Sequence, residues 1–145
     1  MTTDDEIDLE RFISAQYGIY EQALAELEAG RKRSHWMWFV FPQFLGLGAS
    51  HMSRTYAIRS VAEAAAYLAD PTLGPRLLRC TQAMLSVKGK SAHEILGYPD
   101  DLKFHSCMTL FAAVSSRGSV FHIALEHFFE GSPDRKTMVL LSSGA

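Results

Sequence analysis

The chain has 145 residues, of which 48% are hydrophobic and 21% are charged, a composition that predicts a single folded domain (residues 1–145) and excludes a disordered protein. Its 14 Lys and Arg residues against 16 Asp and Glu residues give a net charge of −2, so we expect no bulk binding of nucleic acid. No apolar run approaches the ~20 residues of a membrane-spanning helix and the acidic start lacks signal-peptide features, which predicts a cytoplasmic protein with no membrane partner and with residues 1–7 as a disordered acidic N-terminus.

Two apolar patterns occupy the first third of the chain. Hydrophobic residues from Leu9 to Ala29 recur at spacings of three and four, which predicts one amphipathic helix with Asp8 as its N-cap and Gly30 as its stop. The apolar run at residues 35–41 predicts either a short buried helix capped by Ser34 or a strand.

The remaining periodic segments also favour helices. They cover residues 51–58, 60–69, 73–87, 91–97, 100–114 and 119–128, with a last short helix or strand at residues 137–141. Ser60 and Ser91 begin capping-box sequences, while Ser119 and either Asp100 or Asp101 are N-cap candidates. Because turn residues separate these segments and no hairpin signal occurs, the sequence predicts a mainly α, single compact multi-helix domain.

Cations and tryptophans are concentrated in one stretch. Arg31, Lys32 and Arg33 directly precede a predicted helix start, and two indoles follow it. Free N–H groups at a helix start attract phosphate, guanidinium binds it bidentately, and an indole stacks on a base. The ligand-binding candidates of this stretch are therefore Arg31, Lys32, Arg33, Ser34, His35, Trp36 and Trp38.

The same stretch also has a purely structural interpretation. The cations would favour the C-terminus of the preceding helix, and the tryptophans would belong to the core. Trp36 and Trp38 diverge if the segment is helical, so both can line one pocket only if it is extended.

The remaining candidates are two acidic residues, Glu10 and Asp101, and a polar or charged residue near each of them. Glu10 sits early in the first predicted helix, with Gln16 on roughly the same side, and a partly buried Glu can act as a general acid or base. By position alone, however, an early Glu more often simply favours the helix dipole. The simplest interpretation of Asp101 and Lys103 is a helix cap with a nearby cation that has no function. The alternative is that they form the polar rim of a ligand site.

The six histidines do not predict a metal site. No His-x-x-x-His pair shares a helix face. We therefore expect no metal and no cofactor.

Four stretches of the chain together resemble a bacterial domain-of-unknown-function family that is often automatically labelled calpastatin. They are residues 10–16, residues 30–43, residues 73–77 and residues 100–111, and the resemblance covers nearly the whole chain. The label itself indicates no mechanism, because a calpain inhibitor would be long and disordered and this chain is neither.

More distantly, the chain is similar to the NADAR (YbiA-like) superfamily, whose members carry a Glu-His-x-x-x-Ala-Gln pattern on a helix. Glu10, Ala15 and Gln16 match that pattern, while Arg11 replaces the His. The resemblance implies a YbiA-like fold, a phosphorylated nucleoside or ADP-ribose-like ligand, and hydrolysis of an N-glycosidic bond with Glu10 as the catalytic carboxylate. The alternative is a non-catalytic module that senses a nucleotide or docks a partner protein.

Overall fold

The computed structural model describes residues 7–143, and every regular element in this range is an α-helix. The helices are α1 (Glu10–Gln16), α2 (Tyr20–Glu28), α3 (Met37–Val40), α4 (His51–Thr55), α5 (Val61–Ala69), α6 (Leu73–Ser86), α7 (Ala92–Leu96), α8 (Asp100–Ala113), α9 (Val120–Phe129) and α10 (Arg135–Ser142). An isolated bridge joins Phe44 to Ile58. The prediction of a mainly α fold is confirmed. The segment predicted to be disordered, residues 1–7, lies outside the described residues except for residue 7.

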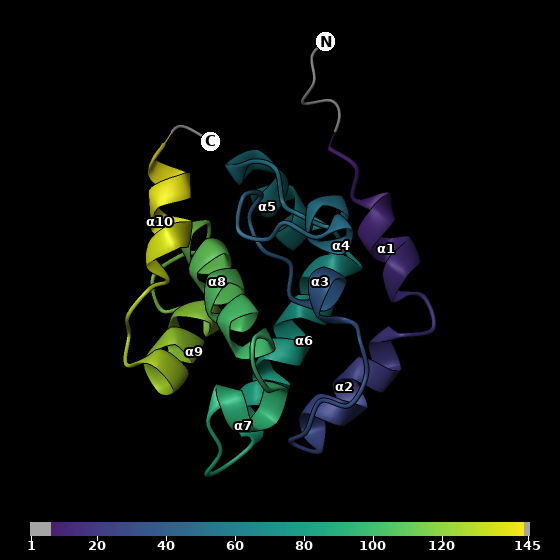
Figure 1. The fold of residues 1–145 in the computed structure, drawn as a ribbon, viewed down its shortest axis with the longest axis vertical. Coiled ribbons are helices and arrows are strands. Elements are labelled where there is room, and N and C mark those ends of the chain that lie inside the picture. The colour runs from purple at the N-terminus through teal and green to yellow at the C-terminus, as the bar shows by residue number, and fades with distance from the viewer. Residues whose placement is uncertain (1–6, 144–145) are drawn as a thin grey trace.

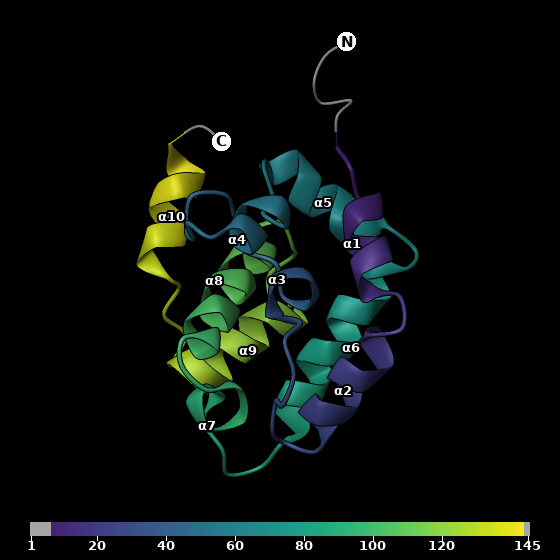
Figure 2. The ribbon, with the colours of Figure 1, turned by 45° about the vertical axis from the view of Figure 1, so that its right-hand side comes forward.

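Two long helices form the centre of the molecule. α8 packs against α5, α7, α9 and α10, and α6 packs against α2, α5 and α9 (Figures 1 and 2). Residues 106–112 of α8 are all buried, so this helix has no wide polar face and must lie inside the bundle.

Aromatic side chains fill the core between these helices. Phe12 and Tyr67 meet edge to face with ring centroids 5.1 Å apart, and Phe41 and Phe104 do so at 5.0 Å. Such tilted pairs are the favoured geometry for aromatic rings. Because these residues come from α1, α5, α8 and the segment after α3, elements far apart in the sequence share one core.

The predicted helix over residues 9–29 is wrong, because the structure divides it into α1 and α2. Tyr17 leaves the helix in an extended conformation, and Gly18 follows with φ +74°. Glycine adopts this left-handed conformation without the steric cost that other residues bear. The amphipathic pattern continues through the break, which is why periodicity alone does not reveal it.

Three of the predicted serine caps are confirmed. Ser60, Ser91 and Ser119 each accept hydrogen bonds from backbone N–H groups of the helix that follows. At Ser91 the capping box is complete, because Glu94 also accepts from the Ser91 N–H. Glu63 instead accepts from the N–H of Arg59, so the box predicted at Ser60 is only half formed.

The other predicted caps are wrong. α1 begins after Leu9 and not after Asp8, α3 after Trp36 and not after Ser34, and α8 after Pro99, and none of these three ends has a side-chain cap. Asp100 and Asp101 lie in the first turn of α8 instead. A carboxylate in that turn still favours the helix dipole.

An ion pair fastens α1 to α5. Arg11 forms two contacts with Glu63 of α5, at 3.1 and 3.2 Å, and donates to the carbonyl groups of Thr55 and Ala57. Glu63 is 2% exposed, and a buried carboxylate of this kind requires a charged partner. Arg11 therefore has a structural role.

Within residues 7–143, each helix falls short of the length and apolar character that crossing a membrane requires.

Candidate functional site

The segment between α2 and α3 is organised by one carboxylate that the sequence did not single out. Glu26 accepts hydrogen bonds from the N–H groups of Arg33 and Ser34, the hydroxyl of Ser34 and Nε1 of Trp36, at 2.6 to 3.1 Å. Partial burial raises the pKa of the Glu26 carboxyl group, but these hydrogen bonds outweigh it and lower the pKa to about 2. Glu26 therefore stays ionised and holds the segment, which bends at Ser34 and His35, against the end of α2.

Burial alternates along residues 31–36 of this segment. Trp36 is fully buried, and Lys32 and Ser34 are partly buried, while the residues between them are exposed. Within residues 7–143, the side chains of Arg31, Arg33 and His35 form no hydrogen bond or ion pair. The predicted cationic group is thus divided between two faces.

Lys32 joins the segment to the start of α8. Its Nζ lies 2.8 Å from a carboxylate oxygen of Asp100, and Nζ of Lys103 lies 3.4 Å from the other oxygen. The Lys32 side chain is only 8% exposed, and its backbone N–H donates to the carbonyl of Ile95. Two lysines thus share one carboxylate.

The two tryptophans have different environments. Trp36 is fully buried, and its one polar group is bonded to Glu26, so it has no free face for a ligand. Trp38 of α3 is half-buried, and Nζ of Lys103 lies 5.2 Å from its ring centroid. Trp36 is thus a core residue, as the structural interpretation predicts, while Trp38 is still partly exposed to solvent.

Gln16 is placed beneath α3 and not beside Glu10. Its amide donates to the carbonyl of Phe39 at 2.7 Å and to the hydroxyl of Tyr67 at 3.2 Å, and its oxygen accepts from Arg76 at 3.2 Å. Burial raises the pKa of Tyr67, so the hydroxyl stays neutral. Gln16 is 2% exposed, and its hydrogen bonds fix the single turn of helix that carries Trp38.

Glu10 is exposed, and its carboxylate accepts from the hydroxyl of Ser14 at 3.2 Å. Both views place α1 near the end of the molecule from which the N-terminus leaves, whereas α2 ends at the opposite end (Figures 1 and 2). The structure therefore does not bring Glu10 together with Arg31, Lys32 and Arg33.

The second acidic candidate of α8 lies beside α7. A carboxylate oxygen of Asp101 is 3.4 Å from Nδ1 of His93. Asp101 therefore lies next to the cluster of Lys32, Asp100 and Lys103 but contacts a different helix. Across residues 7–143, no three His, Cys, Asp or Glu side chains lie close enough to hold a metal ion.

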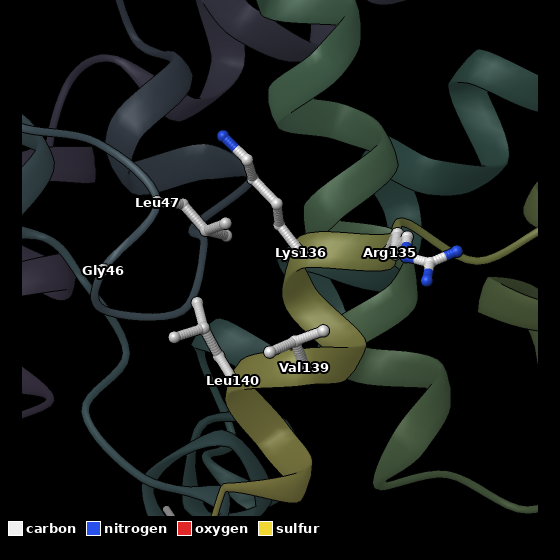
Figure 3. Close-up of a pocket in the computed structure, with 6 residues that line it drawn as sticks. All are labelled: Gly46, Leu47, Arg135, Lys136, Val139 and Leu140. Atoms are coloured by element: carbon white, nitrogen blue, oxygen red, sulfur yellow. The ribbon is translucent and has the colours of Figure 1, made fainter.

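Two pockets lie away from all of these residues. One has a volume of about 330 Å³ and lies between the loop after α3 and helix α10 (Figure 3). The other has a volume of about 240 Å³ and lies between α8, α9 and the start of α10. None of the predicted site residues lines either pocket.

Sequence reasoning missed Glu26 and the first turn of α10 for a related reason. Glu26 lies in the last turn of α2, and Arg135 and Lys136 lie in the first turn of α10. Each charge opposes the dipole of its helix, which favours acids at the start and bases at the end. A charge on the unfavourable end of a helix is thus a signal that could have identified both places.

The comparisons with known proteins concern the whole chain. The profile of a family described as "Protein of unknown function (DUF1810)" matches residues 6–141. The chain belongs to this family. The crystal structure of a conserved hypothetical protein, Rv1873 from Mycobacterium tuberculosis, is similar over 94% of this chain and 98% of that one, with 49% identity and a TM-score of 0.92. A search of curated proteins finds no match.

Proposed function

We propose that this protein is a non-catalytic module that binds a phosphorylated nucleoside or ADP-ribose-like ligand at the surface formed by Lys32, Trp38, Asp100 and Lys103. The observation that carries the proposal is a half-buried indole beside two lysines that share one carboxylate. The indole offers a stacking face for a base, and the ammonium group of Lys103, which shares its carboxylate with Lys32, is a partner for phosphate. The similarity to the NADAR superfamily is the reason for choosing ADP-ribose as the first ligand to test.

The surroundings of this surface support binding because they hold its groups in place before a ligand arrives. Glu26 fixes the segment that carries Lys32, and Gln16 fixes the turn that carries Trp38. Preorganised groups lose little conformational entropy on binding. Arg31 and Arg33 are exposed and Lys32 is nearly buried against Asp100, so in this proposal Lys103 takes the role of phosphate-binding residue and Lys32 holds Asp100 in place.

The non-catalytic form of the proposal follows from the environment of Glu10. Hydrolysis of an N-glycosidic bond needs a carboxylate beside the sugar, and a general acid gains its raised pKa from burial. Glu10 is exposed and contacts Ser14. Nothing in its position supports the catalytic role that the NADAR resemblance implies.

Calorimetric titration with ADP-ribose, ADP and adenosine tests the proposal. We expect ADP-ribose and ADP to bind more tightly than adenosine, and Lys103→Gln or Trp38→Leu to weaken binding about tenfold, since one charge-assisted bond or one stacked ring contributes roughly that factor. Lys88→Gln removes a charge from an exposed loop residue outside this surface and is the matched control. Equal affinity of wild type, Lys103→Gln and Trp38→Leu, or no binding of either nucleotide, would overturn the proposal and favour partner docking.

Chromatography of the incubated ligand separates the two forms of the proposal. We expect ADP-ribose and ADP-ribosylated peptide to be recovered intact, with Glu10→Gln binding as tightly as wild type. Cleavage that disappears in Glu10→Gln would instead support the hydrolase.

A further inference from the structure

The pocket between the loop after α3 and helix α10 has two chemically different parts. Leu47, Val139 and Leu140 supply apolar surface, and Lys136 supplies positive charge. Its volume of about 330 Å³ is at the small end of the range for pockets that bind small molecules. In Figure 3 the Lys136 side chain extends along the pocket towards Leu47, while Arg135 points to the other side of the helix.

Both walls of this pocket are fixed by hydrogen bonds. On the loop side, Leu45 N–H donates to the carbonyl of Ile58, and Ile58 N–H donates to the carbonyl of Gln43. On the helix side, Asp134 accepts from the N–H and hydroxyl of Thr137. The pocket is therefore preformed, which lowers the entropic cost of filling it.

Gly46 sets the distance between the two walls. Its φ is +107°, and a Cβ built on it would lie 3.3 Å from a methyl carbon of Leu140. A residue with a side chain would be strained there and would press on Leu140. The apolar end of the pocket thus depends on the glycine.

The charge of the pocket has one sign. Its lining contains no carboxylate, and within residues 7–143 neither Arg135 nor Lys136 forms an ion pair. Both lie in the first turn of α10, where the helix dipole disfavours a cation. An anion placed beside Lys136 would relieve that repulsion, while an apolar chain attached to it would cover the leucines.

From this combination we infer a second ligand site, beyond the proposed nucleotide surface, that binds a small amphipathic carboxylate. The carboxylate pairs with Nζ of Lys136, and the aliphatic chain lies against Leu47 and Leu140. The small volume favours such a molecule over a peptide, which would need a longer groove.

Titration of ¹⁵N-labelled protein with sodium octanoate tests this inference. We expect saturable shifts of the backbone amide signals of Gly46, Leu47, Lys136 and Leu140. Octanol and octylammonium have the same chain without a negative charge, and both should bind about tenfold more weakly. ADP-ribose should leave these four signals unchanged, so the two proposals succeed or fail separately.

Two variants separate charge pairing from simple contact with an apolar surface. Lys136→Gln should weaken octanoate binding about tenfold, whereas Arg117→Gln, which removes an exposed charge outside the pocket, should leave it unchanged. Octanoate and octylammonium binding equally well, an unchanged affinity in Lys136→Gln, or shifts produced by an acidic peptide and not by octanoate would each overturn the inference.

Discussion

Glu26 links the end of α2 to a segment that has no regular secondary structure. Its carboxylate accepts hydrogen bonds from Arg33, Ser34 and Trp36. Without Glu26, the indole N–H of Trp36 would have no hydrogen-bond partner inside the core. A buried donor without a partner is costly. One residue therefore determines both the direction of the chain after α2 and the burial of a tryptophan.

We expect Glu26→Gln to lower the free energy of unfolding by about 2 kcal/mol at neutral pH, because charge-assisted hydrogen bonds become neutral ones and an amide N–H₂ faces other donors. Urea unfolding followed by circular dichroism measures this loss. The control is Glu28→Gln, an exposed residue of the same helix whose carboxylate lies 4.0 Å from Arg79. Equal losses in the two variants would contradict the role assigned to Glu26.

The difference in stability between wild type and Glu26→Gln should decrease as the pH falls. The pKa of Glu26 is lowered from 4.5 to about 2 in the folded protein, so the unfolded state takes up its proton first as the pH falls. The stabilising effect is therefore fully present above pH 4.5 and decreases as the pH falls towards 2. We expect the difference between wild type and Glu26→Gln to be smaller at pH 3 than at pH 7, and a constant difference would exclude this explanation.

At the scale of elements, α5 and α6 meet in a turn that leaves no space for a side chain. Asp70 accepts hydrogen bonds from the N–H groups of Thr72 and Leu73, both at 2.9 Å. A Cβ on Gly74 would lie 2.1 Å from the backbone oxygen of Leu68, well inside van der Waals contact. Gly74 is therefore required for the close packing of these two helices and not for a left-handed backbone.

We expect Gly74→Ala to destabilise the protein by about 3 kcal/mol, because the two helices must separate to admit the methyl group. Gly89→Ala is the comparison: Gly89 has φ +75° but open space around it, so that variant should lose only about 1 kcal/mol to backbone strain. Thermal unfolding of both variants measures the difference. A smaller loss of stability in Gly74→Ala than in Gly89→Ala would show that the turn between α5 and α6 can move to admit the methyl group.

At the scale of the whole molecule, the two long central helices each bury one thiol. Cys80 of α6 and Cys107 of α8 are both fully buried. Burial raises the pKa of the Cys80 thiol to about 12, and burial also raises the pKa of Cys107 well above its ordinary value. Since the thiolate is the reactive form, both groups should be inert while the bundle is folded.

Alkylation with iodoacetamide at pH 8 should therefore report global unfolding. We expect both cysteines to react at the same slow rate, rising with urea in parallel with unfolding, because α6 and α8 are exposed only when the shared core opens. Mass spectrometry of the alkylated protein gives the rates. The exposed loop residue Ser116 provides the control: the added thiol of Ser116→Cys should react at once, and native Cys80 or Cys107 reacting as fast would contradict a rigid centre.

Sequence patterns by themselves determined the helical class and the start of several helices. The 3.6-residue periodicity and the serines at positions 60, 91 and 119 act over a few residues, so these signals lie within each segment. They failed at Gly18, where the apolar pattern continued through a break. They also failed at Asp8, because α1 begins after Leu9 without a side-chain cap, and at Ser34, because its hydroxyl donates to Glu26.

Tertiary structure alone decided where the predicted site residues lie. Arg31, Lys32, Arg33 and the tryptophans are neighbours along the chain, but their distribution between core and surface depends on Glu26 and Asp100, which belong to other elements. The pocket beside Lys136 likewise exists only because a loop after α3 meets the last helix. Local propensity extends over one turn of helix, whereas burial, charge pairing and cavities arise between segments that the folded chain brings together.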